Sequence, residues 1–260
     1  MTPQDPETDH GGWSSHQLKG DPHADPGKSE RVRSMFTSIA RSYDRNNRIH
    51  SFGLDRCWRT RAVRLAKARP GDHVLDVACG TGDLSEAFAR AGVSQVTGVD
   101  FTPAMIDLAR AKAARFGGNT TTVPQYMVAD AQELPFEDGL FQVVSIAFGL
   151  RNVQEPSRAL NEFYRVLSPG GRLVILEFSE PENRFIRWGS RIWTDRIMPI
   201  TATMIAGDRS GAYRYLPRSI ATFADSQSLV SMMEGAGFQC MEPERLTLGI
   251  CTIHVGCKPT

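Results

Sequence analysis

The sequence predicts an α/β domain in which a mostly parallel sheet is covered by helices on both faces. After Pro70 and Gly71, short runs rich in β-branched residues alternate with segments whose apolar residues recur at helical spacing. This alternation predicts parallel strands, because each helix returns the chain to the edge where the next strand begins. Near the C-terminus two strands follow each other across a short turn, so we expect one antiparallel strand there.

The expected elements follow in a regular order along the chain. Residues 29–68 show helical spacing and predict two helices, with Asn46, Asn47 and residues 51–53 between them. The alternating part predicts strands at 73–78, 95–99, 124–128, 142–147 and 172–178, with helices at 84–91, 103–116 and 156–167. A Pro-Gly-Gly turn at 169–171 leads into the fifth strand. After an interruption at 181–206 come a helix near 226–235 and strands near 238–246 and 250–257.

The N-terminal stretch differs in composition from the rest of the chain. Residues 1–28 contain four prolines and four glycines with almost no apolar residue, so they cannot bury enough surface to offset the entropy lost on ordering. We expect a disordered tail over 1–28 and a single domain over 29–260. Within that domain, residues 29–70 form N-terminal helices and residues 181–206 form an inserted helical lid.

Composition excludes several classes of protein. The 260 residues are 41% hydrophobic and 23% charged, and no uncharged apolar run approaches the ~20 residues that span a bilayer. The net charge of +1 argues against a nucleic-acid binder, although residues 28–69 and 182–218 are locally basic. Five scattered cysteines and the lack of an export signal favour a reduced, cytoplasmic setting. The histidines are too dispersed for a zinc site, so we expect no metal.

A glycine turn after the first strand of the sheet is the most informative segment. Backbone can approach a ligand closely at such a turn, although the G-x-G pattern alone also occurs in NAD sites and in plain tight turns. Acidic residues flank the turn, and a serine stands where a third glycine would complete a dinucleotide motif, so a phosphate would be repelled. An adenosyl ligand with an ammonium and a sulfonium suits these carboxylates better. The residues concerned are Asp76, Gly80, Thr81, Gly82, Asp83 and Ser85.

Two further acids follow the next two strands. Asp100 ends the second strand and can accept hydrogen bonds from both ribose hydroxyls, while its alternative role is to cap the helix that starts at Pro103. Asp130 follows the third strand and can bind the adenine amino group, with the backbone N–H of Ala131 on a ring nitrogen. Taken alone, Asp130 fits an ordinary turn residue equally well. Three acids after three successive strands favour one nucleoside site.

With this glycine turn and these three acids, the chain resembles the S-adenosylmethionine-dependent methyltransferases. Proteins of that class have a Rossmann-like, seven-stranded sheet that includes one antiparallel C-terminal strand. Six further blocks resemble the ubiquinone/menaquinone biosynthesis C-methyltransferase family. They are FTSIARSYD at 36–44, FGLRNV at 148–153, the segment 165–179, YRYLPRSI at 213–220, AGF at 236–238 and the segment 246–250. The resemblance implies methylation of a ring carbon on a polyprenylated quinol, most often demethylmenaquinol. Ala147 departs from members with a serine at this position.

Three alternatives stay open beside this interpretation. The acceptor can be the benzoquinol of ubiquinone synthesis, the chain can be a non-catalytic adenosyl-binding subunit of a quinone-synthesis complex, or the glycine turn can belong to an NAD-dependent reductase. The retained acceptor blocks disfavour the second of these, and Asp83 together with the missing third glycine disfavours the third.

Arg151 and Asn152 directly follow the fourth strand and are the predicted catalytic residues. Arg151 can stabilise a quinolate or orient a water that takes the proton, and Asn152 can hydrogen-bond the quinol oxygen. The competing interpretation is an arginine that only pairs with an acid such as Glu155 or Glu177. Tyr43 lies on a helix that we expect to close over the cofactor, although a core position is equally compatible.

The segment 181–206 combines aromatic residues on one helical face with arginines along its border. A basic amphipathic helix can lie on an anionic membrane surface, where a prenylated substrate is found. Alternatively, the segment is a lid that lines a groove for the substrate tail, and the two roles are compatible. Peripheral membrane contact and a homodimer are therefore open as partner interactions.

Overall fold

The computed structural model describes residues 13–14, 17–115, 122–198, 200–201 and 211–260. Five parallel strands form the centre of one sheet in the order β3-β2-β1-β4-β5. They are β1 (His73–Val77), β2 (Gln95–Asp100), β3 (Gln125–Val128), β4 (Phe141–Ala147) and β5 (Leu167–Phe178). All five expected strands are present, and the turn predicted at 169–171 is an irregular stretch inside β5, where the register with β4 shifts.

The C-terminal strands complete the sheet and include its one antiparallel strand. Strand β8 (Cys251–Cys257) pairs antiparallel with β5. Two short strands, β6 (Gln239–Cys240) and β7 (Glu244–Leu246), pair antiparallel with successive parts of β8 and so run in the direction of β5. The single strand expected at 238–246 is therefore interrupted, at a point where Pro243 has no N–H to donate to a ladder. The mixed sheet of the predicted fold class is confirmed.

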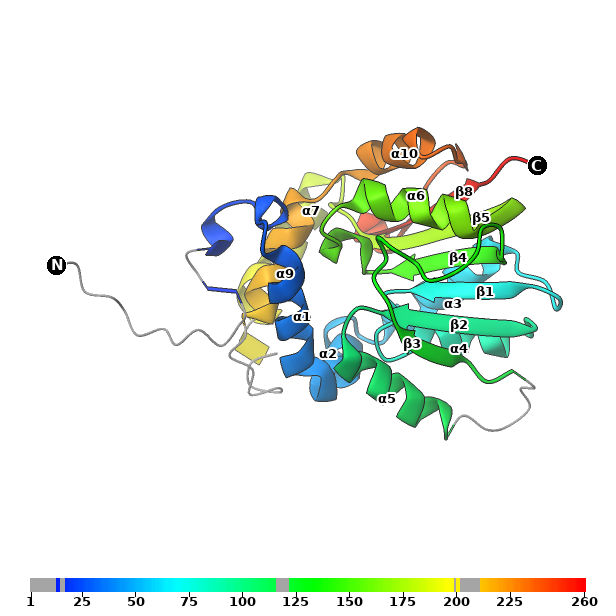
Figure 1. Cartoon of the computed structure of the whole chain (residues 1–260). Helices are drawn as coiled ribbons and strands as arrows, with labels where there is room; N and C mark the ends of the chain where they lie inside the picture. Colours follow the sequence, from blue (N-terminus) through cyan, green and yellow to red (C-terminus); the bar gives the residue numbers. More distant parts are fainter. Residues whose placement is uncertain (1–12, 15–16, 116–121, 199, 202–210) are drawn as a thin grey trace.

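Helices cover both faces of this sheet (Figure 1). On one face, α6 (Pro156–Val166) and α10 (Ser226–Gly235) bury Leu160, Phe163 and Met233 against the central strands. On the other face, α3 (Leu54–Ala66) and α4 (Asp83–Arg90) pack through side chains such as Trp58 and Phe88. Helix α5 (Pro103–Ala113) packs on β2 and β3. Each helix thus places its apolar stripe on the sheet, as its sequence spacing predicts.

The N-terminal helices differ from the prediction. Among the described residues, three α-helices precede the sheet: α1 (Lys28–Ile39), α2 (Tyr43–His50) and α3. The expectation that Asn46 and Asn47 lie between two helices is wrong, because both belong to α2. Asn46 is only 1% exposed, and its amide donates to the hydroxyl of Tyr213. This long-range contact holds an asparagine in a helix where local preference disfavours it.

The N-terminal stretch also departs from the disorder expected over 1–28. Among the residues described there, Trp13 is 2% exposed, and two short 3-10 helices span Gln17–Lys19 and Pro22–Ala24. Trp13 helps to anchor this stretch, because it belongs to a cluster with Val32 and Met35 of α1 and with Tyr215, which all lie outside the stretch. Composition alone does not reveal such an anchor.

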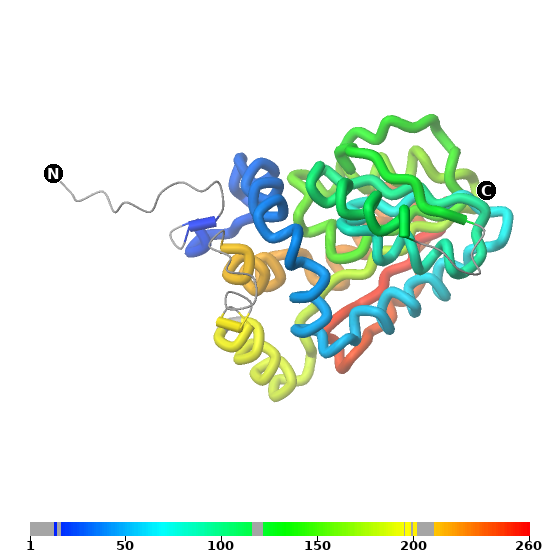
Figure 2. Tube along the Cα trace, turned by 90° about the horizontal axis from the view of Figure 1, so that it is seen from below, coloured from blue at the N-terminus to red at the C-terminus, as the bar shows by residue number. Residues whose placement is uncertain are grey.

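The lid segment and its neighbours gather at one end of the sheet (Figure 2). It contains α7 (Arg184–Ile192) and a π-helical turn at Trp193–Ile197, and α9 (Ala212–Thr222) follows it. Residues 199 and 202–206 of the predicted lid lie outside the described residues. Within the described part of the chain, no helix combines the length and apolar character needed to cross a membrane.

Candidate active site

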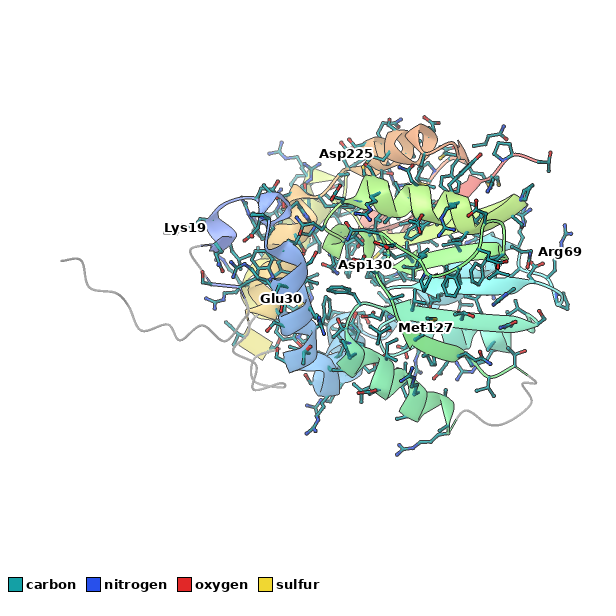
Figure 3. The ribbon with its side chains drawn as sticks, viewed as in Figure 1. Lys19, Glu30, Arg69, Met127, Asp130 and Asp225 are labelled. Carbon is teal, nitrogen blue, oxygen red and sulfur yellow. The ribbon has the colours of Figure 1, made fainter. Side chains whose placement is uncertain are left out.

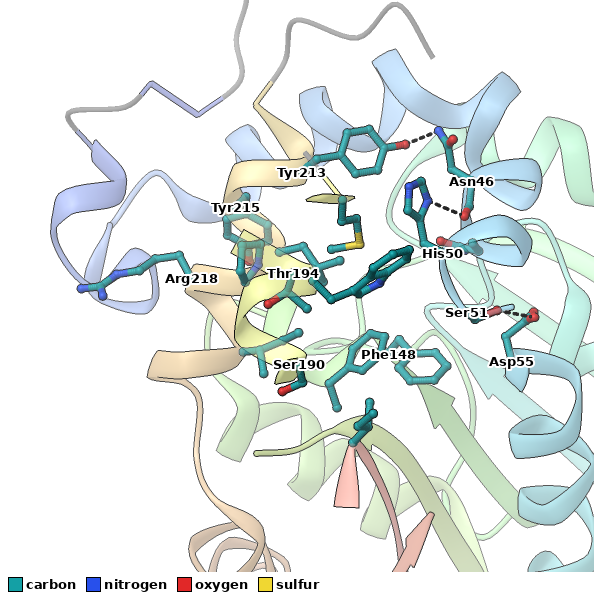
Figure 4. A pocket seen from close by; sticks show the side chains of 18 of the residues that line it. Asn46, His50, Ser51, Asp55, Phe148, Ser190, Thr194, Tyr213, Tyr215 and Arg218 are labelled. Carbon is teal, nitrogen blue, oxygen red and sulfur yellow. Dashed lines mark hydrogen bonds between the residues drawn. The ribbon is translucent and has the colours of Figure 1, made fainter. Parts of the chain in front are cut away.

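Two adjoining cavities lie where the parallel strands end. The smaller, of about 90 Å³, is lined by the ends of β1, β2 and β4 and by the segment 129–132. The larger, of about 1320 Å³, is lined mainly by α1, α2, α3, α7 and α9 (Figure 4). Tyr43 and Phe148 line both cavities. Two ligands held in these cavities would therefore meet beside Tyr43 and Phe148.

Four of the predicted cofactor residues line the smaller cavity: Gly80, Asp100, Asp130 and Ala131. Figure 3 places Asp130 at the end of the sheet that faces Glu30 of α1, opposite the end where Arg69 lies. The Asp130 carboxylate accepts from the backbone N–H of Gln132 at 2.9 Å, so Asp130 also has the turn role that the sequence left open.

Asp100 connects the glycine turn to the end of β2. Its Oδ2 accepts from the N–H of Gly80 at 2.8 Å, and its Oδ1 accepts from the N–H of Thr102 at 2.8 Å. Burial raises the pKa of this carboxyl above its ordinary value, while both N–H donors favour the charged form. Each carboxylate oxygen can accept a further bond, so ribose hydroxyls can be added without breaking these contacts.

The lining of the smaller cavity does not include Asp76, Thr81 or Gly82. Asp76 is 1% exposed and accepts from the hydroxyls of Ser85 at 2.6 Å and Ser145 at 3.0 Å. Asp76, Thr81 and Gly82 stay predicted cofactor residues, and the hydrogen bonds of Asp76 also connect the first strand to α4 and β4.

Thr81 and Gly82 belong to the glycine turn itself. Thr81 donates its hydroxyl to Asp44 of α2. A Cβ on Gly82, whose φ is +89°, would lie 2.2 Å from the Tyr126 hydroxyl, so only glycine fits there.

The charge of Asp83 is paired in the structure, whereas Asp100 contacts the glycine turn. Asp83 forms an ion pair with Lys112 at 2.5 Å and lies 3.9 Å from Arg59, and these cations lower the pKa of its carboxyl. Its charge is thus compensated, contrary to the expectation that it repels phosphate. Asp100 takes over that role, because its carboxylate already occupies the N–H of Gly80 that a phosphate would need. A phosphate-free nucleoside fits this donor and acceptor set.

The buried Asp76 leads to a prediction about stability and pH. Burial raises its pKa from 3.8 to about 6, against the opposing effect of its two serine donors. Between these values only the folded state holds the proton, so stability falls as the pH rises through this window, by roughly 3 kcal/mol in all. We expect the difference in unfolding free energy between the wild type and Asp76→Asn to change by about that amount between pH 4 and pH 7, measured with urea. A difference that does not vary with pH would contradict this.

Arg151 and Asn152 follow β4 in a short 3-10 turn at Leu150–Asn152. Arg151 is 5% exposed, and its Nη1 donates to Glu177 at 2.6 Å and to the carbonyl of Phe148 at 2.7 Å. The expected pairing with an acid is thus present, with Glu177 as the partner. Arg151 lines the larger cavity, and its buried Nε has no hydrogen-bond partner within the described part of the chain. The guanidinium of Arg151 therefore places a positive charge at the wall of that cavity.

Asn152 lines the smaller cavity, and its amide orientation is fixed by two contacts. Its Nδ2 donates to the carbonyl of Phe148 at 3.2 Å, and its Oδ1 accepts from the hydroxyl of Tyr215 at 3.0 Å. The second N–H of the amide has no assigned partner in these contacts and can donate to a ligand. Phe148 adopts a positive φ of 57°, an uncommon conformation for a bulky residue that concentrates at functional sites.

Tyr215 is the site residue that sequence reasoning missed. The block 213–220 points to α9 without assigning a role to any of its side chains. The hydrogen bond from Tyr215 to Asn152 joins residues 63 positions apart, and no local sequence pattern indicates such a pair.

Comparison with known proteins identifies the family of the chain. Residues 25–258 match the model of the ubiE/COQ5 methyltransferase family. The chain belongs to this family. A demethylmenaquinone methyltransferase from Thermus thermophilus is 45% identical over 86% of this chain and 100% of its own length. A ubiquinone/menaquinone biosynthesis C-methyltransferase from Teredinibacter turnerae is 42% identical over 89% of this chain and 92% of its own.

Members of the ubiE/COQ5 family use S-adenosylmethionine, and this chain is an S-adenosylmethionine-dependent C-methyltransferase of that type. Among solved structures, the [4+2]-cyclase SpnF has a TM-score of 0.66 at 17% identity and covers 89% of this chain and 96% of its own. A methyltransferase from Thermotoga maritima, described as a possible histamine N-methyltransferase, has a TM-score of 0.60 at 19% identity, over 87% of this chain and 99% of its own. These likenesses support the fold alone.

Proposed function

We propose that the protein methylates a ring carbon of a polyprenylated quinol, with demethylmenaquinol as the acceptor. The observation that supports this most strongly is the meeting of two cavities at Phe148, with acids for a nucleoside on one side and Arg151 on the other. The Thermus thermophilus relative is named for demethylmenaquinone, and other relatives are named for both quinones. The benzoquinol of ubiquinone synthesis is therefore the second candidate.

We assign donor binding to the smaller cavity. Asp100 would accept from the ribose hydroxyls, Asp130 from the adenine amino group, and Gly80 would allow close approach of backbone. The bound S-adenosylmethionine supplies an electrophilic methyl group on its sulfonium. Asp76, Thr81 and Gly82 would act indirectly, through the shape of the turn.

We assign acceptor activation to Arg151 and Asn152. A quinol carbon becomes nucleophilic when the neighbouring hydroxyl gives its proton to a water, and negative charge then reaches the ring. That carbon would take the methyl group as S-adenosylhomocysteine leaves, and loss of the proton on the carbon, with return of a proton to the oxygen, would restore the aromatic quinol. The guanidinium of Arg151 would stabilise that negative charge, while Glu177 holds the guanidinium in place. The free N–H of Asn152 would orient the same acceptor. Holding donor and acceptor in line can lower the barrier by ~7 to 11 kcal/mol.

The larger cavity suits the prenylated part of the acceptor. Its lining includes Met35, Ile39, Trp58 and Phe178, side chains that give an apolar wall to a hydrocarbon tail. A non-catalytic subunit would have no need for Arg151 beside this cavity together with Asn152 in the adjoining smaller one.

The decisive experiment gives the purified protein S-adenosylmethionine with reduced demethylmenaquinol or with the matching benzoquinol. Mass spectrometry should detect a product heavier by one methylene unit from the naphthoquinol. Methylation of the benzoquinol alone would reassign the acceptor, and methylation of neither would reject the proposal.

We also propose that α7 contacts the membrane in which the acceptor resides. Phe185 and Trp188 are 76% and 68% exposed on this helix, and Arg184 and Arg191 lie on it as well. Exposed aromatic residues with cationic neighbours favour an anionic lipid surface.

A vesicle experiment tests this contact. We expect the Phe185→Ser/Trp188→Ser variant to lose binding to vesicles that contain phosphatidylglycerol, measured by cosedimentation. Val123→Ser changes a residue that is 52% exposed just before β3 and serves as the control. Equal binding by wild type and double variant would contradict the contact.

A further inference from the structure

A segment outside the matched family domain lies against the acceptor side of the site. The family model matches residues 25–258, whereas the structure also describes residues 13–14 and 17–24. We call residues 13–14 and 17–27 the N-terminal strap. Its Leu18 lines the larger cavity together with residues of α9. The strap is thus part of the cavity wall, although most of it precedes the domain that the family shares.

The strap is anchored on α9 through Trp13. The Trp13 ring stacks on the Tyr215 ring with centroids 4.9 Å apart and planes 17° from parallel, and both side chains are at most 2% exposed. A Cβ on Gly211, whose φ is +79°, would lie 2.3 Å from the carbonyl oxygen of Trp13. This close approach of two backbones requires a glycine at the start of α9.

Further along, hydrogen bonds tie the strap to the next turns of the same helix. The side chain of Arg218 donates to the carbonyl of Gly20 at 3.0 Å. His23 Nε2 lies 2.9 Å from the carbonyl of Ser219, and burial lowers the pKa of this imidazole, which favours its neutral form. A neutral imidazole protonated at Nε2 would donate to that carbonyl. The strap therefore follows α9 over about two turns.

The end of the strap reaches the residues that follow Asn152. The carbonyl of Asp25 accepts from the Gln154 amide at 3.1 Å. Directly after the strap, Lys28 is 0% exposed, and its Nζ donates to the carbonyl of Val153 at 2.5 Å. Burial lowers the pKa of this lysine to about 8. The strap therefore contacts both sides of Asn152 through its neighbours, since Trp13 packs on Tyr215, which donates to the Asn152 amide, and Asp25 binds Gln154.

We propose that the N-terminal strap, through Trp13, makes Tyr215 a positioning residue that holds the Asn152 amide toward the quinol oxygen. This rests on the proposed function, in which Asn152 contacts the acceptor. Without the stacked Trp13, Tyr215 is free to leave its position, and the Asn152 amide loses the donor that fixes its orientation. The strap acts on the acceptor step, because Asp100 and Asp130 make no contact with Trp13 or Tyr215 among the hydrogen bonds and ring contacts of the described chain.

Steady-state kinetics with Trp13→Ala, Tyr215→Phe and the double variant test the proposal. Losing the orienting hydrogen bond should lower kcat about 10-fold in either single variant, with a smaller effect on the Kd for S-adenosylmethionine, because Asp100 and Asp130 keep their contacts. The double variant should lose no more than Tyr215→Phe, because both changes interrupt the same contact. Trp13→Phe, which retains a stacking ring, should recover most of the activity. The control Lys19→Ala removes an exposed strap side chain and should behave as wild type.

A second measurement tests the role of the strap independently of the methylation reaction. Hydrogen–deuterium exchange of peptides covering residues 148–153 should be faster in Trp13→Ala than in wild type and unchanged in Lys19→Ala. Unaltered exchange in folded Trp13→Ala, or losses that multiply in the double variant, would overturn the proposal. If the wild type methylates no quinol, the proposed function fails, while the exchange measurement still decides whether the strap holds Asn152. Thermal unfolding of each variant shows that the folded protein is being compared.

Discussion

An Asp100→Ala variant is expected to bind S-adenosylmethionine at least 100-fold more weakly than the wild type while remaining folded. Two charge-assisted hydrogen bonds to the ribose are lost, each worth about 1.5 to 3 kcal/mol. The N–H groups of Gly80 and Thr102 also lose their acceptor, so the glycine turn loses its link to β2. Isothermal titration calorimetry measures the change in Kd directly.

Asp107→Ala is the matched control for this variant. Asp107 lies on α5 close to Asp100 in sequence, is exposed, and is not among the residues that line the smaller cavity. Its removal should leave the Kd for S-adenosylmethionine within about 2-fold, because exposed charges contribute little. If Asp100→Ala binds the donor as tightly as Asp107→Ala does, Asp100 does not belong to the donor site.

The sheet and the edge residues were predictable because their causes are local. Runs of β-branched residues specify strands, and a parallel sheet brings the residues after its strands to one edge. Gly80, Asp100 and Asp130 follow three such strands, so their meeting follows from topology. The same topological reasoning applies only partly to Asp76. It lies inside β1, where the direction of a side chain depends on packing, and its carboxylate accepts hydrogen bonds from Ser85 and Ser145.

The acceptor side was less predictable because its contacts join distant parts of the chain. Arg151 had two candidate partners in sequence, and only packing selects Glu177 on the neighbouring strand over the nearby Glu155. The stacking of Trp13 on Tyr215 joins residues that lie far apart in the sequence, and no hydrophobic periodicity indicates this contact. The low apolar content of the first 28 residues predicted disorder, because composition carries no information on packing partners elsewhere in the chain.

The buried pair of Arg151 and Glu177 gives the largest expected loss of stability. Their side chains are 6% and 3% exposed, with Nη1 and Oε1 2.6 Å apart. Glu177→Ala leaves a buried guanidinium without its counter-charge, and we expect a loss of about 3 to 5 kcal/mol in the free energy of unfolding. Glu133→Ala, which breaks the exposed pair with Arg158, should cost less than about 1 kcal/mol. Urea unfolding of both variants measures these losses.

A double variant separates the structural role of this pair from its role in the reaction. Replacing a buried ion pair by apolar side chains is often neutral for stability, so Arg151→Met/Glu177→Leu should regain most of the stability that Glu177→Ala loses. Its turnover with the quinol should nevertheless stay at least about 100-fold below wild type, because no donor remains for the quinolate oxygen. Donor binding should be unchanged, since Arg151 does not line the smaller cavity. A stable double variant with full turnover would show that Arg151 serves the fold alone.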